Sequence, residues 1–264
     1  MGVQSIALSF AARSPHDSLA GASGQPERPI ERHPLLNHGP EMTPPERIWL
    51  LRHAETTAPH VFNGSESDVS LSELGFRQAE ALGSWFVPCR PTAVVSSTMI
   101  RAIQTALPIA RDCAVAHTRE HLLRERSIGP MSGMVFHPTV GPWAETVREW
   151  SSGNTTYTTA GAESFDDLKV RLHEGWRNVV EAHPGGRVVV VAHGIVCKVL
   201  LLTLLRGWTL GDWSKVGKVF NASVSELVPG DDGFWHAESL LEVPNTVSAL
   251  AESAQIPGAV RSEA

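Results

Sequence analysis

Two histidines in the sequence each follow a short apolar run that is typical of a buried β-strand. Residues 48–51 precede Arg52 and His53, and four valines at 188–191 come shortly before His193. Ligands of α/β proteins bind in the crevice at the carboxyl ends of the strands. Two imidazoles and a guanidinium at this edge indicate phosphoryl chemistry. One imidazole would attack phosphorus, the other would steady the charge, and the guanidinium would hold the phosphate.

Arg101 is a second candidate for holding a phosphate. It follows Ser96 and Ser97, which come directly after the apolar residues 93–95. Small polar residues at this point indicate that a helix begins, and the free N–H groups of a helix N-terminus favour an anion. An arginine one turn into the helix would add a bidentate donor. The alternative for Arg101 is an exposed position on the helix surface.

Glu125 is the candidate proton donor. A phosphate ester needs a proton on its departing oxygen, and a carboxyl group can supply one. Glu125 stands between Arg124 and Arg126, so a surface ion pair is the alternative when this residue is taken alone. Gly194, directly after His193, would let the backbone approach a ligand closely.

The composition narrows the class of protein. The 264 residues carry a formal net charge of −6, which argues against a nucleic-acid binder with a basic face. Three cysteines without a CxxC spacing favour a reducing compartment over a disulfide framework or a zinc site. No apolar run approaches the roughly 18 residues of a membrane span. We therefore expect a cytoplasmic protein without a nucleic-acid or membrane partner.

Strand-like and helix-like segments alternate along the middle of the chain. Short apolar runs predict strands, and apolar residues at helical spacing predict helices. The predicted strands are 48–51, 93–95, 114–117, 187–191, 221–228 and 234–237, and the predicted helices are 72–86, 98–110, 163–182 and 195–205. This alternation predicts a three-layer α/β fold, with a mostly parallel central sheet and helices on both faces.

The two ends of the chain differ from this pattern. Residues 1–45 are rich in proline and contain none of the eight tryptophans, so we expect a disordered N-terminal extension, with Met42 as an alternative start. Residues 241–264 are small and polar, and we expect a flexible C-terminal tail. The predicted domain is 46–240.

Six segments resemble the histidine phosphatase superfamily, branch 1, whose fold is phosphoglycerate mutase-like. The matching segments are 51–56, 71–79, 96–106, 123–133, 161–164 and 191–194, and they fall in the family's order. The resemblance implies that His53 is the phosphorylated nucleophile and that Glu125 is the proton donor. It further implies a phosphate pocket of Arg52, Arg101 and His193.

Thr56, Asn63 and Gly194 are further candidates for phosphate binding, and we expect no cofactor and no metal. The chain also departs from the family pattern. Ala54 replaces the usual glycine, and the usual asparagine is absent near Ala58. Ser65 stands where an arginine is common. Asn63 is the nearest equivalent of the missing asparagine. The sequence therefore does not identify the residue that makes one of the contacts that orient the phosphate.

These residues predict a phosphomonoesterase that hydrolyses a small phosphorylated metabolite through a phosphohistidine, as a monomer or homodimer. A phosphoglycerate mutase-like phosphotransferase is the alternative. The resemblance implies a longer, arginine-rich insertion for a mutase, and residues 133–161 hold one arginine, Arg148. A non-catalytic phospho-ligand binding module is a third hypothesis, although all five core residues are present. A metal hydrolase is disfavoured because the two histidines lack a clustered carboxylate set.

The segment 128–159 is expected to contact the leaving group of the substrate. Its large apolar residues could line a partly apolar cap. They could equally belong to the core. These residues are Met131, Met134, Phe136, Trp143 and Trp150.

Overall fold

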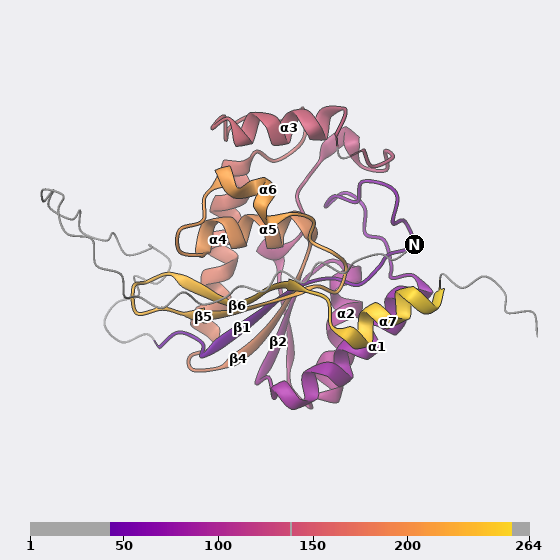
Figure 1. The fold of residues 1–264 in the computed structure, drawn as a ribbon, viewed down its shortest axis with the longest axis vertical. Helices are drawn as coiled ribbons and strands as arrows, with labels where there is room; N and C mark the ends of the chain where they lie inside the picture. Colours follow the sequence, from indigo (N-terminus) through magenta and orange to yellow (C-terminus); the bar gives the residue numbers. More distant parts are fainter. Residues whose placement is uncertain (1–42, 138, 255–264) are drawn as a thin grey trace, which may run out of the picture. The chain divides into compact units, whose positions relative to one another are not determined.

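The computed structural model describes residues 43–137 and 139–254, with side chains up to residue 250. Its centre is a six-stranded sheet in the order β3-β2-β4-β1-β5-β6 (Figure 1). In chain order the strands are β1 Arg47–Arg52, β2 Ala93–Ser97, β3 His117–Glu120, β4 Arg187–Ala192, β5 Val224–Pro229 and β6 Trp235–Glu242. The first four are parallel, whereas β5 and β6 form an antiparallel hairpin. This sheet confirms the predicted fold class.

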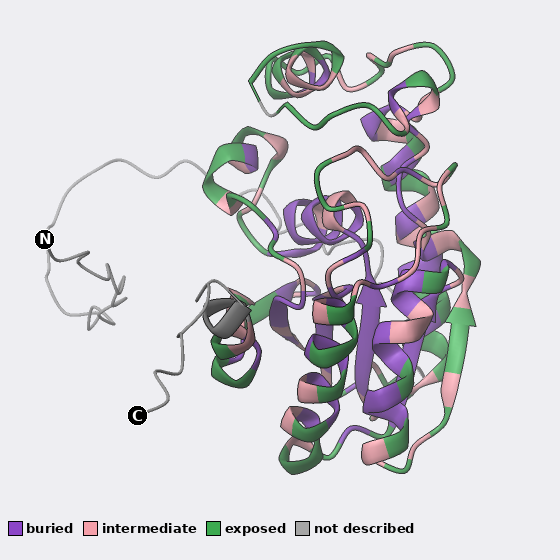
Figure 2. Ribbon diagram, turned by 90° about the vertical axis from the view of Figure 1, so that its right-hand side faces the viewer, coloured by how far each residue is buried: buried purple, intermediate pink, exposed green. Residues whose placement is uncertain are grey.

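Helices cover both faces of the sheet and complete the three layers. α1 (Glu73–Phe86) and α2 (Ile100–Asp112) cover one face, and α4 (Phe165–Ala182) and α5 (Gly194–Leu204) cover the other (Figure 1). Successive side chains of a strand point to opposite faces. In β1, Trp49 therefore packs with α1 and α2, and Leu50 packs with α4 and α5. The central strands are buried on both faces (Figure 2).

Most predicted elements appear within two residues of their predicted bounds. Ser72 and Ser164 begin α1 and α4 as N-caps, because each hydroxyl accepts a backbone N–H of the first turn. The predicted helix 98–110 begins and ends two residues later, since β2 continues through Ser97 and Met99 is still extended.

The predicted strand 114–117 is wrong by three residues. α2 continues to Asp112, and the chain then turns through Ala114, whose φ is +53°. Val115 packs against the apolar cluster of α1 and α2 and lies before the strand begins. Its apolar side chain therefore misled the prediction. β3 instead uses the polar residues His117–Glu120 at the edge of the sheet, where partly exposed side chains are tolerated.

Several shorter helices were not predicted. They are η1 Val87–Cys89, η2 His121–Leu123, η3 Gly129–Met131, α3 Pro142–Ser151, η4 Leu210–Asp212 and α6 Trp213–Val216. α3 lies beyond the carboxyl ends of the parallel strands (Figure 1). Its Trp150 is completely buried and contacts Trp213, so this residue belongs to the core. Met134 and Phe136 are exposed, which leaves them as cap candidates.

The ends of the chain are described only in part. The predicted N-terminal extension lies outside the described residues, apart from 43–45. Residues 241–254 differ from the expected flexible tail, because they form the end of β6 and helix α7 (Asn245–Ala254). Val247 of α7 is buried in the cluster that α1 and α2 form, and this burial explains the ordered helix. Residues 255–264 lie outside the described part.

A helix with the length and apolarity of a membrane span is absent from the described part of the chain.

Candidate active site

The pairing of β1 with β4 brings the two strand-end histidines together. Arg52 pairs with Ala192, so His53 and His193 leave adjacent parallel strands at the same edge of the sheet. Their ring centres are 5.2 Å apart. The juxtaposition that the sequence predicted is therefore present.

His53 is held in a defined tautomer. Its backbone N–H donates to the Ala192 carbonyl at 2.9 Å, and its Nδ1 lies 2.7 Å from the Ala54 carbonyl. Because a carbonyl only accepts, Nδ1 carries the proton and Nε2 keeps its lone pair. Burial, followed by the charges of Arg101 and Arg52, holds the pKa of His53 well below 6.5. The imidazole is therefore neutral near pH 7 and nucleophilic at Nε2.

His193 carries its proton on the other ring nitrogen. Its Nδ1 accepts from Nε of Arg101 at 3.2 Å, and its Nε2 lies 2.8 Å from Oγ of Ser97. Since a guanidinium only donates, Nε2 is the protonated nitrogen of the neutral ring. Burial and then the charge of Arg101 hold the pKa of His193 well below 6.5. Both ring nitrogens are thus fixed by protein groups.

Arg101 links the second histidine to the loop 57–70. Its side chain is completely buried near the start of α2. Nη1 donates to the Ser67 carbonyl at 2.8 Å, and Nη2 is shared between the carbonyls of Asn63 (3.3 Å) and Gly64 (3.4 Å). The guanidinium therefore fixes the loop that follows His53 and brings its positive charge to the strand edge.

Arg52 offers a buried donor to a ligand. Its Nη1 donates to the Val219 carbonyl at 2.7 Å. Its Nε is buried without a hydrogen-bond partner among the groups of residues 43–137 and 139–254. Buried donors in folded proteins are nearly always satisfied. An anion bound beside His53 would supply the acceptor, as expected of a phosphate pocket.

Glu125 lies in the same cluster of charges. Its Oε1 accepts from its neighbour Arg126 N at 2.9 Å, and Oε2 lies 3.4 Å from the N–H of Ile195 in the first turn of α5. Glu125 is only 8% exposed. Burial lowers the pKa values of Arg52 and Arg101, and the Glu125 charge opposes this for both. The carboxyl therefore lies close enough to both guanidiniums for its charge to act on them.

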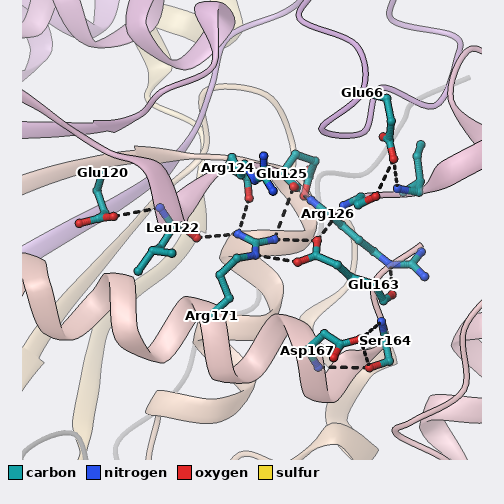
Figure 3. A network of polar contacts seen from close by, with 12 residues as sticks. Glu66, Glu120, Leu122, Arg124, Glu125, Arg126, Glu163, Ser164, Asp167 and Arg171 are labelled. Atoms are coloured by element: carbon teal, nitrogen blue, oxygen red, sulfur yellow. Dashed lines mark hydrogen bonds and ion pairs between the residues drawn. The ribbon is translucent and has the colours of Figure 1, made fainter. Parts of the chain in front are cut away.

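Two other glutamates that could donate a proton are engaged elsewhere. The Glu163 carboxylate forms a bidentate pair with Arg171, with N–O distances of 2.7 and 2.8 Å (Figure 3). The Glu55 carboxylate accepts from the Ser72 hydroxyl at 2.8 Å at the start of α1. Of the three, Glu125 is the one whose charge acts on both Arg52 and Arg101.

With this geometry established, comparison with known proteins identifies the family. A model of the histidine phosphatase superfamily (branch 1) matches residues 48–241. The chain belongs to this superfamily. A histidine phosphatase hydrolyses phosphate monoesters, and the described geometry is consistent with that chemistry.

Named relatives agree with this assignment. The metal-independent phosphoserine phosphatase of Arabidopsis thaliana is 34% identical over 207 residues, which cover 76% of this chain and 83% of the relative. Phosphoglycerate mutase-like protein 4 of Arabidopsis thaliana is 30% identical, covering 78% and 87% of the two chains.

A solved structure shows the same similarity. The mycobacterial glucosyl-3-phosphoglycerate phosphatase superposes with a TM-score of 0.63 at 26% identity, covering 74% of this chain and 98% of that one. Further structures of that mycobacterial enzyme contain inorganic phosphate or VO3.

Three further candidates of this histidine phosphatase have weaker links to the pocket. The side-chain amide of Asn63 donates to the Ala58 carbonyl at 2.7 Å and so braces its own loop. Thr56 is buried, and its backbone pairs with Leu71. A Cβ on Gly194 would lie 3.6 Å from Nε of Arg52, an ordinary contact. Phosphate binding by these three residues stays a prediction.

Sequence reasoning missed residues that orient the histidines. Ser97 contacts His193, and the Thr105 hydroxyl accepts the Ala54 N–H at 3.0 Å. The side-chain amide of Asn221 donates to the carbonyls of His53 (3.0 Å) and Ala54 (3.1 Å). Ser97 and Thr105 lie in the matched segment 96–106, which was a usable signal. Asn221 gave none, because it contacts residues far away in the sequence.

Within residues 43–137 and 139–254, no group of three or more His, Cys, Asp or Glu side chains is arranged to hold a metal ion. Metal-independent turnover itself stays a prediction.

Proposed function

We propose that this histidine phosphatase hydrolyses a small phosphorylated metabolite through a phosphohistidine on His53, with Glu125 as proton donor. The observation that carries the proposal is the state of the His53 ring. Its Nδ1–H is fixed on the Ala54 carbonyl, and its lowered pKa leaves Nε2 unprotonated near pH 7. Phosphorus can be attacked only by such a lone pair.

The reaction has two steps in this scheme. In the first, Nε2 of His53 bonds to phosphorus, the ester P–O bond breaks, and Glu125 gives its proton to the departing oxygen. In the second, water attacks phosphorus, its proton passes to Glu125, and the N–P bond breaks to release phosphate. Arg52 and Arg101 offset the charge of the phosphoryl oxygens in both steps.

The substrate class is supported by the relatives and by the cap. The named phosphatases act on phosphoserine and on glucosyl-3-phosphoglycerate, both of which are small phosphate esters. The cap segment 128–159 contributes the exposed Met134 and Phe136. We expect the leaving group to contact this side of the site. A screen of phosphorylated sugars, hydroxy acids and amino acids identifies the preferred member.

A phosphoglycerate mutase-like activity remains the alternative, because one relative carries that name. Retaining a bisphosphate requires several cations beyond the first phosphate pocket. The cap between Gly133 and Gly161 has no lysine and a single arginine, Arg148, which is exposed on α3. This supports hydrolysis. Release of inorganic phosphate without interconversion of 2- and 3-phosphoglycerate would confirm it.

The decisive experiment traps the intermediate. Protein mixed with ³²P-labelled substrate and quenched in alkali should keep the label, whereas acid quenching should release it, because phosphohistidine is acid-labile. His53→Ala should show no label and lose turnover by on the order of 10⁴–10⁶-fold. Near-normal turnover of this variant would overturn the mechanism. A non-catalytic binding module would bind phosphate but release none from p-nitrophenyl phosphate.

Inhibitors and chelators separate this mechanism from metal-assisted hydrolysis. Turnover should persist after prolonged treatment with EDTA, and vanadate should inhibit by occupying the phosphate pocket. Loss of activity in EDTA that a divalent ion restores would assign the enzyme to another class.

The cellular location and the assembly are also part of the proposal. Cys89, Cys113 and Cys197 are free thiols, which supports a reducing, cytoplasmic compartment. Fractionation of cells tests the location. Sedimentation distinguishes a monomer from a homodimer.

A further inference from the structure

The proposed proton donor lies on a segment outside the helices and the sheet. Glu125 falls between η2 and η3, where residues 124–128 form neither helix nor strand. Catalytic groups on such segments need other contacts to hold them in place. The residues that supply these contacts therefore decide where the carboxyl group stands.

Arg171 of α4 supplies several of these contacts at once. Its Nη1 donates to the carbonyls of Leu122 (2.6 Å) and Arg124 (2.9 Å), and Nη2 lies 3.5 Å from the carbonyl of Glu125 itself (Figure 3). The guanidinium thus contacts three backbone carbonyl oxygens, two from residues shortly before the proposed proton donor and one from Glu125 itself.

Glu163 extends the same network to the far side of the donor. Its carboxylate pairs with Nε and Nη2 of Arg171, and its Oε2 accepts the N–H of Ser127 at 2.7 Å (Figure 3). The pair therefore fixes the backbone on both sides of Glu125. The side chains of Arg171 and Glu163 are only 13% and 20% exposed, so water screens the pair less than on an open surface.

We propose that Arg171 is a positioning residue, which holds Glu125 where its proton reaches the leaving oxygen. This inference rests on the proposed role of Glu125. The planar guanidinium suits the task, because its fixed fork serves a carboxylate on one side and carbonyl oxygens on the other. A lysine has a single ammonium group and cannot reproduce both sides.

The consequence for catalysis is selective. Misplacing a reacting group by about 1 Å costs on the order of 10² in rate. A misplaced Glu125 slows only those substrates whose leaving oxygen needs a proton. Alkyl phosphates are of this kind, whereas p-nitrophenolate leaves without help.

The experiment compares two substrates in matched variants. Arg171→Met should lower kcat for an alkyl phosphate about 10–10²-fold and leave p-nitrophenyl phosphate within about threefold. Arg177→Met, an exposed arginine on the same helix, should change neither substrate. Melting temperatures are measured for all variants. Equal losses on both substrates in Arg171→Met would overturn the inference, because a purely structural role predicts that result.

Two further variants keep the test informative if Arg171→Met does not fold. Arg171→Lys should retain a charge but show the same selective loss. Glu163→Gln keeps a hydrogen-bonding group of the same size, and should show a smaller selective loss.

Glu125→Gln separates the two proposals. If it shows no preference for alkyl phosphates, the proposed proton donor is wrong. If it shows the preference and the Arg171 variants do not, only the positioning role is wrong.

Discussion

The two halves of this site are held by different interactions. The proposed nucleophile His53 continues a parallel strand, and its backbone is hydrogen-bonded to Ala192 of the neighbouring strand. The proposed donor Glu125 lies on an irregular segment. The side chain of Arg171 in α4 holds this segment by hydrogen bonds to its backbone carbonyls. One half is fixed mainly by the sheet and its buried apolar residues, and the other by ionic hydrogen bonds.

This difference implies that the two halves can be damaged separately. A change near His53 should affect every substrate equally, because every substrate needs the nucleophile. A change near Glu125 should depend on the leaving group. The ratio of rates on an alkyl and an aryl phosphate therefore reports which half has been disturbed.

Among changes that leave His53 itself in place, the largest expected effect is on the donor side. Glu125→Gln removes the proton but keeps the shape of the side chain, so it should slow alkyl phosphates about 10²–10⁴-fold. p-Nitrophenyl phosphate should slow far less. Steady-state kinetics on both substrates measures the ratio. If both rates drop alike in a folded protein, Glu125 positions the substrate instead of protonating it.

A smaller effect is expected on the nucleophile side. Asn221→Ala removes the amide that holds the Ala54 carbonyl, the acceptor of the His53 proton. Misplacement of His53 through loss of this contact should lower kcat about 10–10²-fold. Both substrates should slow by the same factor. Asn178→Ala, which removes an exposed contact with Glu120, is the control. A loss confined to alkyl phosphates would place Asn221 on the donor side.

The buried histidines should make stability depend on pH. Their pKa values in the folded protein lie well below the 6.5 of an unfolded chain, through burial first and Arg101 second. Below pH 6.5 the unfolded chain therefore binds protons that the folded protein does not, so the free energy of unfolding falls with falling pH. Each unit of lowered pKa is worth about 1.4 kcal/mol.

Urea unfolding between pH 7.5 and 5 measures this dependence. His193→Asn should make the free energy of unfolding depend less on pH. The control is His60→Asn, which changes an exposed histidine and should leave this dependence as it is. A slope that is the same in all three proteins would show that the buried imidazoles are not its source.

The smallest effect is expected at Ala54, where the family usually has glycine. Its methyl group is completely buried with Leu71 and Ala79. Ala54→Gly should therefore lower the free energy of unfolding by about 0.8 kcal/mol, the value of one buried methyl group. Turnover should change less than about threefold. A large rise in kcat would instead show that the methyl group obstructs the phosphoryl group.

Sequence patterns predicted the parts of the site that local structure determines. Apolar runs located the strands, and the residues after them gave His53 and His193. Arg101 followed from its place at the start of a helix. These predictions succeed because the carboxyl ends of parallel strands meet at one edge.

The missed parts depend on contacts between distant segments. Arg171 lies in a predicted helix, but nothing local shows that its guanidinium reaches the carbonyls of residues 122–125. The bounds predicted for β3 were wrong by three residues, because an edge strand needs no continuous apolar run. Both cases show that tertiary contacts, and not local periodicity, decide these positions.

The pairing of β1 with β4 has a consequence for how the chain folds. Arg47 pairs with Arg187, so the sheet joins segments from opposite ends of the domain. Contacts of such long sequence separation form slowly, because closing a large loop costs conformational entropy before the contacts can stabilise the chain. During synthesis β1 stays without its parallel neighbour until residues 187–192 have left the ribosome. The site that His53 and His193 share therefore depends on the pairing of two strands that lie far apart in the sequence, and it cannot form before β4 does.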